Sequence, residues 1–163
     1  MPVTAVRRDA HNLTMTIVAE FESTPERVWQ LWADPRQLER WWGPPTYPAT
    51  VTVFELRPGG RVRYHMTGPS GDQSYGYWQV LDINPPGSLS LLNGLADEHG
   101  QPNPDVPAST LTLNIRAIGG GRTQMSIQNR FPSVEAMERM LAMGMEQGMT
   151  LAVGQIDAIL VEP

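Results

Sequence analysis

The sequence predicts an α+β domain in which a curved antiparallel β-sheet of about seven strands wraps around one long C-terminal helix. Segments of alternating apolar and polar residues recur along residues 13–130. Two short helical segments follow the first of them, and a long amphipathic segment ends the chain. Period-two alternation indicates half-buried strands, whereas apolar residues three or four positions apart indicate a helix.

The first strand and the two helices are predicted from alternation and from helix-start signals. Thr24 followed by Pro25 marks one helix start, because a threonine side chain caps free N–H groups and proline suits the first helical position. Asp34 followed by Pro35 repeats the signal, and a Gly-Pro-Pro run ends the second helix. The apolar residues of the preceding strand, 13–22, share one face: Met15, Ile17, Ala19 and Phe21.

Six further strands follow the two helices. Glycine-rich turns at 57–60 and 119–121 each join two of them, as expected for neighbouring antiparallel strands. The long segment 96–107 contains three prolines and is predicted to be a loop, long enough to act as a flap. The expected strands are residues 50–56, 61–67, 74–83, 89–95, 109–118 and 123–130.

The last element is predicted to be one continuous helix over residues 134–160, capped by Ser133. Its apolar residues recur at helical spacing, and at 1.5 Å per residue it would be roughly 40 Å long. A helix of that length crosses a whole sheet, so the order of elements predicts the helix-grip arrangement. The chain is expected to form a single domain, 1–163, with its core over about 13–160.

Composition and charge narrow the functional classes. The chain has no cysteine and a net charge of −5, and its basic residues do not cluster. Nucleic-acid binding normally requires a clustered basic surface, so no nucleic-acid partner is expected. No apolar run approaches the ~20 residues of a membrane span, and the N-terminus lacks a signal-peptide pattern. These features predict a cytoplasmic protein, and a homodimer is left open.

Several motifs together resemble the SRPBCC or START-like (Bet v 1-like) superfamily, within it the family named after the activator of heat-shock-protein-90 ATPase. They are Thr-Pro-Glu-Arg-Val-Trp at 24–29, Leu-Glu-Arg-Trp-Trp-Gly-Pro at 38–44 and Leu-Arg-Pro-Gly-Gly-Arg-Val at 56–62, with Gly76 and Gly-Arg-Thr at 121–123. The resemblance implies a cavity between sheet and helix that takes up a small hydrophobic molecule. Relatives commonly carry Gly-Trp in the last helix, where this chain has Gly148-Met149.

The inward residues of the strands, the tryptophan pair and the methionine stripe of the last helix are the candidates for the pocket wall. Methionine adapts to varied apolar shapes, although an amphipathic helix also buries such a stripe as ordinary core. Glu55 is the candidate polar pocket group, with pairing to Arg57 or Arg63 as the alternative. The predicted pocket residues are Trp41, Trp42, Phe54, Tyr64, Met66, Trp78, Leu91, Met125, Ile127, Met137, Leu141, Met145 and Met149.

No catalytic residue, metal site or cofactor is predicted. His11, His65 and His99 lack ligand spacing, and no nucleophile-elbow pattern is present. The sequence therefore favours binding of a small hydrophobic or aromatic molecule over catalysis. Two alternatives follow from the resemblance: a cyclase- or aromatase-like enzyme using the same cavity, and a chaperone-ATPase accessory protein. An ionisable group inside the pocket would favour the enzyme.

Overall fold

The computed structural model describes residues 2–162 and contains one antiparallel sheet of eight strands. The strand order is β1-β2-β8-β7-β6-β5-β4-β3. Helices α1 (Pro25–Ala33) and α2 (Pro35–Trp41) follow β2, and α3 (Val134–Ala142), α4 (Met145–Val153) and α5 (Ile156–Leu160) follow β8. The strands are β1 Val3–Asp9, β2 Thr14–Phe21, β3 Ala49–Phe54, β4 Arg61–Thr67, β5 Gln73–Asn84, β6 Ser88–Ala96, β7 Ser109–Gly119 and β8 Arg122–Arg130.

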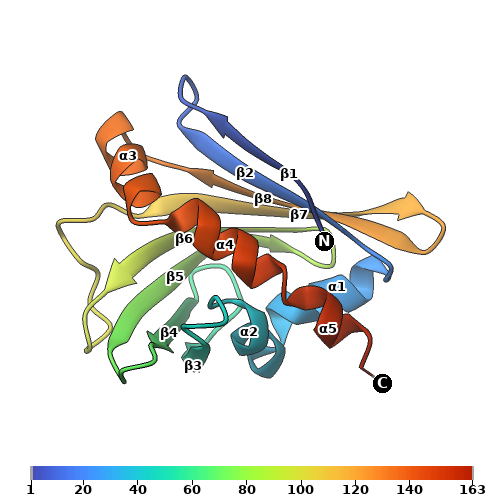
Figure 1. Ribbon diagram of the computed structural model, residues 1–163, viewed down its shortest axis with the longest axis horizontal. Coiled ribbons are helices and arrows are strands. Elements are labelled where there is room, and N and C mark those ends of the chain that lie inside the picture. The colour runs from blue at the N-terminus through green and yellow to red at the C-terminus, as the bar shows by residue number, and fades with distance from the viewer. Residues whose placement is uncertain (1, 163) are drawn as a thin grey trace.

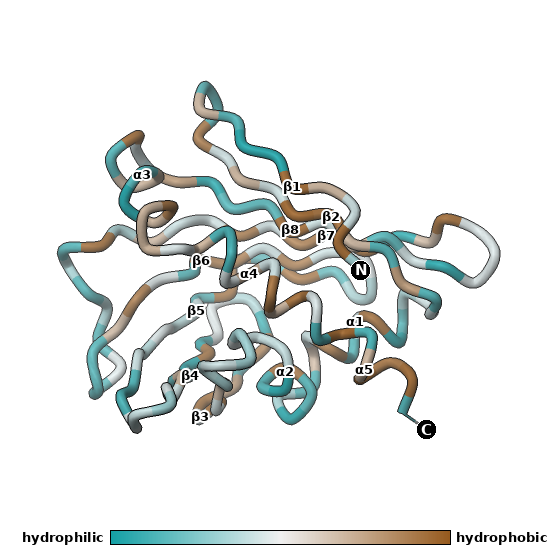
Figure 2. Tube along the Cα trace, viewed as in Figure 1, coloured by the Kyte–Doolittle hydropathy of each residue, from teal (hydrophilic) through white to brown (hydrophobic). Residues whose placement is uncertain are grey.

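The predicted fold class is confirmed. In Figure 1, α4 lies across one face of the sheet, with α3 near one end of it and α5 beside α1 at the other. The tube in Figure 2 shows the hydropathy behind this arrangement, because brown apolar residues recur along the central strands while teal residues gather in loops. Within the described residues, no helix has the length and apolar character needed to cross a bilayer.

The structure has one strand more than the sequence predicted. β1 pairs antiparallel with β2, and the register shifts between Val3 and Ala5. That irregularity breaks the alternation by which strands are recognised in a sequence. β1 is also an edge strand, and its last three residues are exposed. An edge strand with little buried surface carries little of the apolar pattern that predicts a strand.

The expected single C-terminal helix is instead three helices. Gly144 separates α3 from α4 and has a φ of +86°, which a continuous right-handed helix does not allow. Gly154 ends α4, and α5 begins two residues later. The apolar spacing continues across both interruptions, so the periodicity alone predicted one helix.

The three predicted helix caps are confirmed. The Thr24 hydroxyl accepts a hydrogen bond from the Arg27 backbone N–H at 3.3 Å. The Asp34 carboxylate accepts one from the Arg36 N–H at 2.9 Å, and the Ser133 hydroxyl accepts one from the Ala136 N–H at 3.1 Å. Caps are local interactions, which is why the sequence predicts them well.

The buried apolar residues form two clusters. The large one lies between α1, α2, α5 and the centre of the sheet, and its indole rings include those of Trp32, Trp41 and Trp78, none of them exposed. The small cluster lies beneath α3 and contains Met15, Ile17, Phe131, Ala136 and Met137. Met149 of α4 packs against both clusters. Within the C-terminal segment, α3 therefore packs on the small cluster, α5 packs on the large one, and α4 contacts both.

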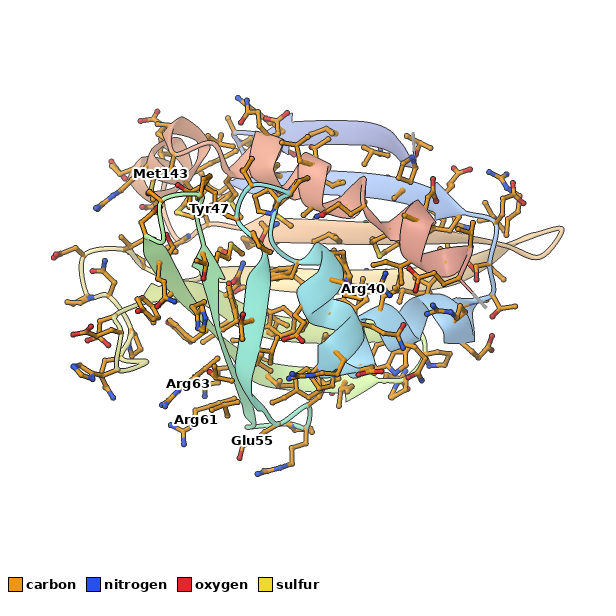
Figure 3. All side chains as sticks on the ribbon, turned by 60° about the horizontal axis from the view of Figure 1, so that its bottom comes forward. Arg40, Tyr47, Glu55, Arg61, Arg63 and Met143 are labelled. Atoms are coloured by element: carbon orange, nitrogen blue, oxygen red, sulfur yellow. The ribbon has the colours of Figure 1, made fainter. Side chains whose placement is uncertain are left out.

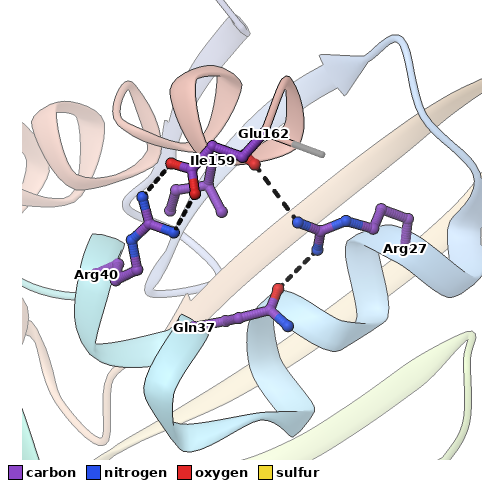
Figure 4. A network of polar contacts seen from close by, with 5 residues as sticks. All are labelled: Arg27, Gln37, Arg40, Ile159 and Glu162. Atoms are coloured by element: carbon purple, nitrogen blue, oxygen red, sulfur yellow. Dashed lines mark hydrogen bonds and ion pairs between the residues drawn. The ribbon is translucent and has the colours of Figure 1, made fainter.

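Polar contacts fix α5 to the short helices (Figure 4). Arg40 donates to the Glu162 carboxylate, with Nη1 2.9 Å from Oε1. Arg27 donates through Nη1 to the Gln37 side chain at 2.6 Å and through Nη2 to the Ile159 carbonyl at 3.5 Å. These contacts hold the end of the chain against α1 and α2.

Candidate functional site

A cavity of about 270 Å³ lies between one end of the sheet and the α3–α4 segment. The exit of α2, strands β4 and β6, the start of β7 and the two helices all contribute to its wall. Met143, 59% exposed, marks its rim. The lining residues are Trp41, Trp42, Pro44, Tyr64, Met66, Asn93, Gly94, Leu95, Val106, Pro107, Ser109, Met140, Met143, Gly144, Met145, Gly148, Met149, Ala152 and Val153.

The structure brings six of the predicted pocket residues to this cavity: Trp41, Trp42, Tyr64, Met66, Met145 and Met149. Four others point inward but are completely buried in the large cluster, and these are Trp78, Leu91, Met125 and Ile127. Indole rings fill the space over the centre of the sheet. One example is Trp32, whose Nε1 lies 3.4 Å from the Met125 sulfur. The remaining space is therefore confined to one end of the sheet.

The last three predicted pocket residues also lie away from the cavity wall. Phe54, at the end of β3, packs against the large cluster. Met137 belongs to the small cluster beneath α3, and Leu141 packs against it. The break at Gly144 changes the direction of the chain, so that the apolar residues of α3 and α4 do not form one stripe facing one cavity.

Glu55 lies outside the cavity. Its carboxylate accepts a hydrogen bond from the Arg61 backbone N–H at 3.2 Å and lies 3.5 Å from the Arg57 guanidinium. Figure 3 shows Glu55 near Arg61 and Arg63, at the opposite end of β3 and β4 from Met143. The register of β3 shifts between Val51 and Val53, which breaks the alternation that suggested an inward side chain. The environment of Glu55 is therefore the one that the alternative interpretation predicted, in which Glu55 pairs with Arg57.

Sequence reasoning missed the part of the wall that comes from a loop and a strand end. Val106 and Pro107 close one side of the cavity, and the Arg139 guanidinium of α3 donates to the Asp105 carbonyl at 2.7 Å. The other end of the 96–107 segment forms a turn held by the Asp97 carboxylate. Prolines predict such a loop but not which of its residues returns to the core.

Tyr64 is the principal polar group of the cavity. It is 8% exposed, and its hydroxyl donates to the Asn93 side-chain oxygen over 3.4 Å. Its ring packs edge-on against Trp42, with centroids 6.0 Å apart, and against Trp78, with centroids 6.4 Å apart. Burial raises the pKa of Tyr64 to about 12, although the nearby indole N–H groups of Trp42 and Trp78 lower it. The phenol is therefore neutral at physiological pH.

The cavity wall carries no ionic side chain: none of its residues is Asp, Glu, Lys, Arg or His. Across residues 2–162, no group of three or more His, Cys, Asp or Glu side chains is placed to hold a metal ion. The arrangement can enclose an apolar molecule and offer it a few neutral hydrogen-bonding groups. It contains no side chain that is charged at neutral pH and could exchange a proton with a ligand.

The sheet gripping a C-terminal helical segment, with an apolar cavity between them, defines a protein of the SRPBCC or START-like superfamily. Residues 22–161 match the family described as Activator of Hsp90 ATPase homolog 1-like protein. The chain belongs to that family. A search of curated proteins finds no match to it.

Solved structures agree with this assignment. Protein Ms6760 from Mycobacterium smegmatis is 46% identical with a TM-score of 0.92, and the match covers 99% of each chain. A protein from Arthrobacter aurescens is also 46% identical, with a TM-score of 0.94 over 99% of this chain and 93% of that one. A protein from Rhodobacter sphaeroides is 25% identical, with a TM-score of 0.81 over 96% and 97% of the two chains.

Proposed function

We propose that the protein binds a small hydrophobic or aromatic molecule in the cavity between β4, β6 and α4. The observation that carries this proposal is a cavity of about 270 Å³ whose wall is mostly apolar and has no charged side chain. Ligand sites are typically concave and apolar, with a few polar groups that orient the ligand. This cavity has that composition.

The residues of α4 support the proposal because they leave space rather than fill it. A Cβ at Gly148 would meet no atom within 4 Å. Next to it, Met149 places a flexible thioether where relatives commonly carry an indole. Met145 of α4, Met140 of α3 and Met143 at the end of α3 add three more thioethers to the wall. Methionine side chains adjust to ligands of different shape at small energetic cost. An adaptable apolar wall suits a molecule with few directional contacts.

The cavity favours binding over the alternative of an enzyme. A cyclase-like reaction requires a group that removes or delivers a proton, poised near the working pH. Tyr64 is the lone titratable side chain in the cavity wall as described, and burial raises its pKa to about 12. A phenol with that pKa donates a hydrogen bond but is a poor proton acceptor at neutral pH.

The proposal is tested by filling the cavity. Met149→Trp should place an indole in the space, so that the neutral fluorescent probe N-phenylnaphthylamine no longer binds. Leu151→Trp is the matched control, because Leu151 is 58% exposed and lies outside the cavity wall. The measurements are probe fluorescence and the rise of the melting temperature with probe concentration, which reports binding to the folded state.

Binding by wild type and Leu151→Trp, together with loss of binding in Met149→Trp, is the expected result. Equal binding by both variants would show that the probe occupies another surface, and the proposal would then fail. Native mass spectrometry of protein purified from its own host complements the test, because a co-purifying mass identifies the ligand class directly.

A further inference from the structure

We infer that the ligand is uncharged and carries an oxygen acceptor, such as a carbonyl or ether oxygen, that is held by the Tyr64 hydroxyl. The inference rests on the proposed function, because it specifies the chemical class of molecule bound in the same cavity. It depends on three observations: the fixed position of the Tyr64 ring, the hydrogen-bonding groups around its hydroxyl, and the absence of charge in the described cavity wall.

The Tyr64 hydroxyl is held in one place by its neighbours. A Cβ at Gly76, on the adjacent strand β5, would lie 2.4 Å from the hydroxyl oxygen, so the phenol lies directly against the backbone of this glycine. The indole rings of Trp42 and Trp78 pack edge-on against the phenol at interplanar angles of 84° and 69°. A polar group held this firmly can orient a ligand without losing much side-chain entropy on binding.

The surrounding groups leave the hydroxyl one role, that of a donor. Within residues 2–162, the indole N–H groups of Trp42 and Trp78 are buried and have no hydrogen-bond partner, and both indole rings pack against the Tyr64 ring. An indole nitrogen can only donate, and both indoles lower the pKa of Tyr64, as donors close to the phenol oxygen do. A further donor would be repelled there, whereas the O–H proton stays available for an acceptor.

The present acceptor of that proton is a poor one. The Tyr64 hydroxyl lies 3.4 Å from the Asn93 Oδ1, whereas O–H···O hydrogen bonds are commonly about 2.7 to 2.8 Å long. Asn93 also lines the cavity, so its amide lies beside any ligand that reaches the phenol. A ligand oxygen at ordinary hydrogen-bond length would therefore replace a weak contact with a better one.

The lack of charge in the wall excludes an ionised ligand group at this position. A carboxylate or phosphate buried beside Tyr64 would have no cationic side chain among the residues that line the cavity. Burying an unpaired charge is far more costly than burying a neutral oxygen that receives one hydrogen bond. The raised pKa of Tyr64 reflects the same penalty on negative charge.

The test compares three probes of the same shape. The naphthyl ketone Prodan carries a carbonyl acceptor, its counterpart with propyl in place of propionyl has none, and a third counterpart carries a carboxylate there. Each is titrated against wild type, Tyr64→Phe and Tyr77→Phe. Tyr77 is the matched control, because it lies next to Trp78 on β5 and outside the cavity wall.

Wild type and Tyr77→Phe should bind the ketone about two- to tenfold more tightly than the propyl compound, the range that one net hydrogen bond supplies. Tyr64→Phe should bind the two equally, and the carboxylate should bind most weakly to wild type. If Tyr64→Phe is unstable, the affinities of wild type for the ketone, the propyl compound and the carboxylate still test whether the ligand must be neutral and carry an acceptor.

Other results separate failure of the inference from failure of the proposed function. Equal wild-type affinity for ketone and propyl compound would overturn the acceptor requirement while leaving the cavity as a binding site. A preference that persists in Tyr64→Phe would overturn the role of Tyr64, and tight carboxylate binding would overturn the requirement for a neutral ligand. If none of the probes binds, the proposed function itself fails with it.

Discussion

Two adjacent tryptophans show how differently neighbouring residues can be used. Trp41 is fully buried, and its indole N–H donates to the Leu31 carbonyl at 2.9 Å. Trp42 is 7% exposed, and its N–H finds no acceptor in the described part of the chain. The sequence placed both tryptophans among the candidates for the pocket wall. Both are buried, and both contribute atoms to the cavity wall.

Tyr64 should make the folded state sensitive to alkali. Its pKa is raised from 10.0 to about 12, so the unfolded chain ionises this phenol at lower pH than the folded chain does. The stabilisation is complete below about pH 10 and is lost as pH rises through about 12. We expect a loss of about 2 to 3 kcal/mol in the free energy of unfolding.

The measurement is urea unfolding across this pH range for wild type, Tyr64→Phe and Tyr77→Phe. The slope of unfolding free energy against pH should flatten in Tyr64→Phe alone. An unchanged slope in that variant would show that other groups cause the alkaline sensitivity. The buried environment, which comes from side chains far apart in the sequence, is the reason why no sequence pattern predicts this shift.

At the scale of elements, the glycines of the C-terminal segment have opposite roles. Gly144 has a φ of +86°, so Gly144→Ala should strain the backbone and destabilise the fold by about 1 to 2 kcal/mol. Gly148 lies within α4, and a Cβ there meets no atom within 4 Å. Gly148→Ala should therefore stabilise the fold by up to about 1 kcal/mol.

Both effects are measured by urea unfolding. A shifted midpoint with an unchanged dependence of the unfolding free energy on urea concentration reports a change in stability. Each variant serves as the control for the other, since the same methyl group is added four residues apart. A stabilising Gly144→Ala would mean that α3 and α4 join into one continuous helix in solution, as the periodicity alone suggests.

The elements that the sequence predicted correctly are those set by local interactions. The caps at Thr24, Asp34 and Ser133 and the hairpin of β7 and β8 follow from adjacent residues. β1, the break at Gly144 and the placement of Glu55 depend on register shifts or on a single φ angle. For the cavity wall, alternation in the sequence shows that Tyr64 and Met66 share one face of β4, but it does not show where indole rings close the space over Met125.

At the scale of the whole molecule, the contact between Arg40 and Glu162 joins the end of the chain to α2. The Arg40 hydrogen bond lowers the pKa of Glu162 below its ordinary value of 4.5. The pair therefore stabilises the folded state above the unfolded pKa and loses this contribution as pH falls through the lowered folded value. Because both side chains are about half exposed, the effect should be small and weakened by salt.

Glu162→Gln should lower the melting temperature slightly at neutral pH. On acidification, the melting temperature of this variant should fall less than that of wild type. Glu98→Gln is the control, because Glu98 is an exposed acid in the loop after β6. Calorimetry at low and high salt measures the difference. If the melting temperature of Glu162→Gln changed with pH in the same way as that of wild type, the contact in Figure 4 would contribute nothing to stability.

The two separate apolar clusters bear on how the cavity could open. One side of the cavity belongs to the large cluster through Trp41, Trp42 and Tyr64, whereas Met140 and Met145 on the other side pack against the small one. Separating α3 from Met15 and Phe131 would therefore open the cavity on the side of the small cluster without requiring the large cluster to unfold. Such local opening costs less than global unfolding. If the protein binds a ligand as proposed, substitutions beneath α3 are therefore expected to alter how long that ligand stays bound.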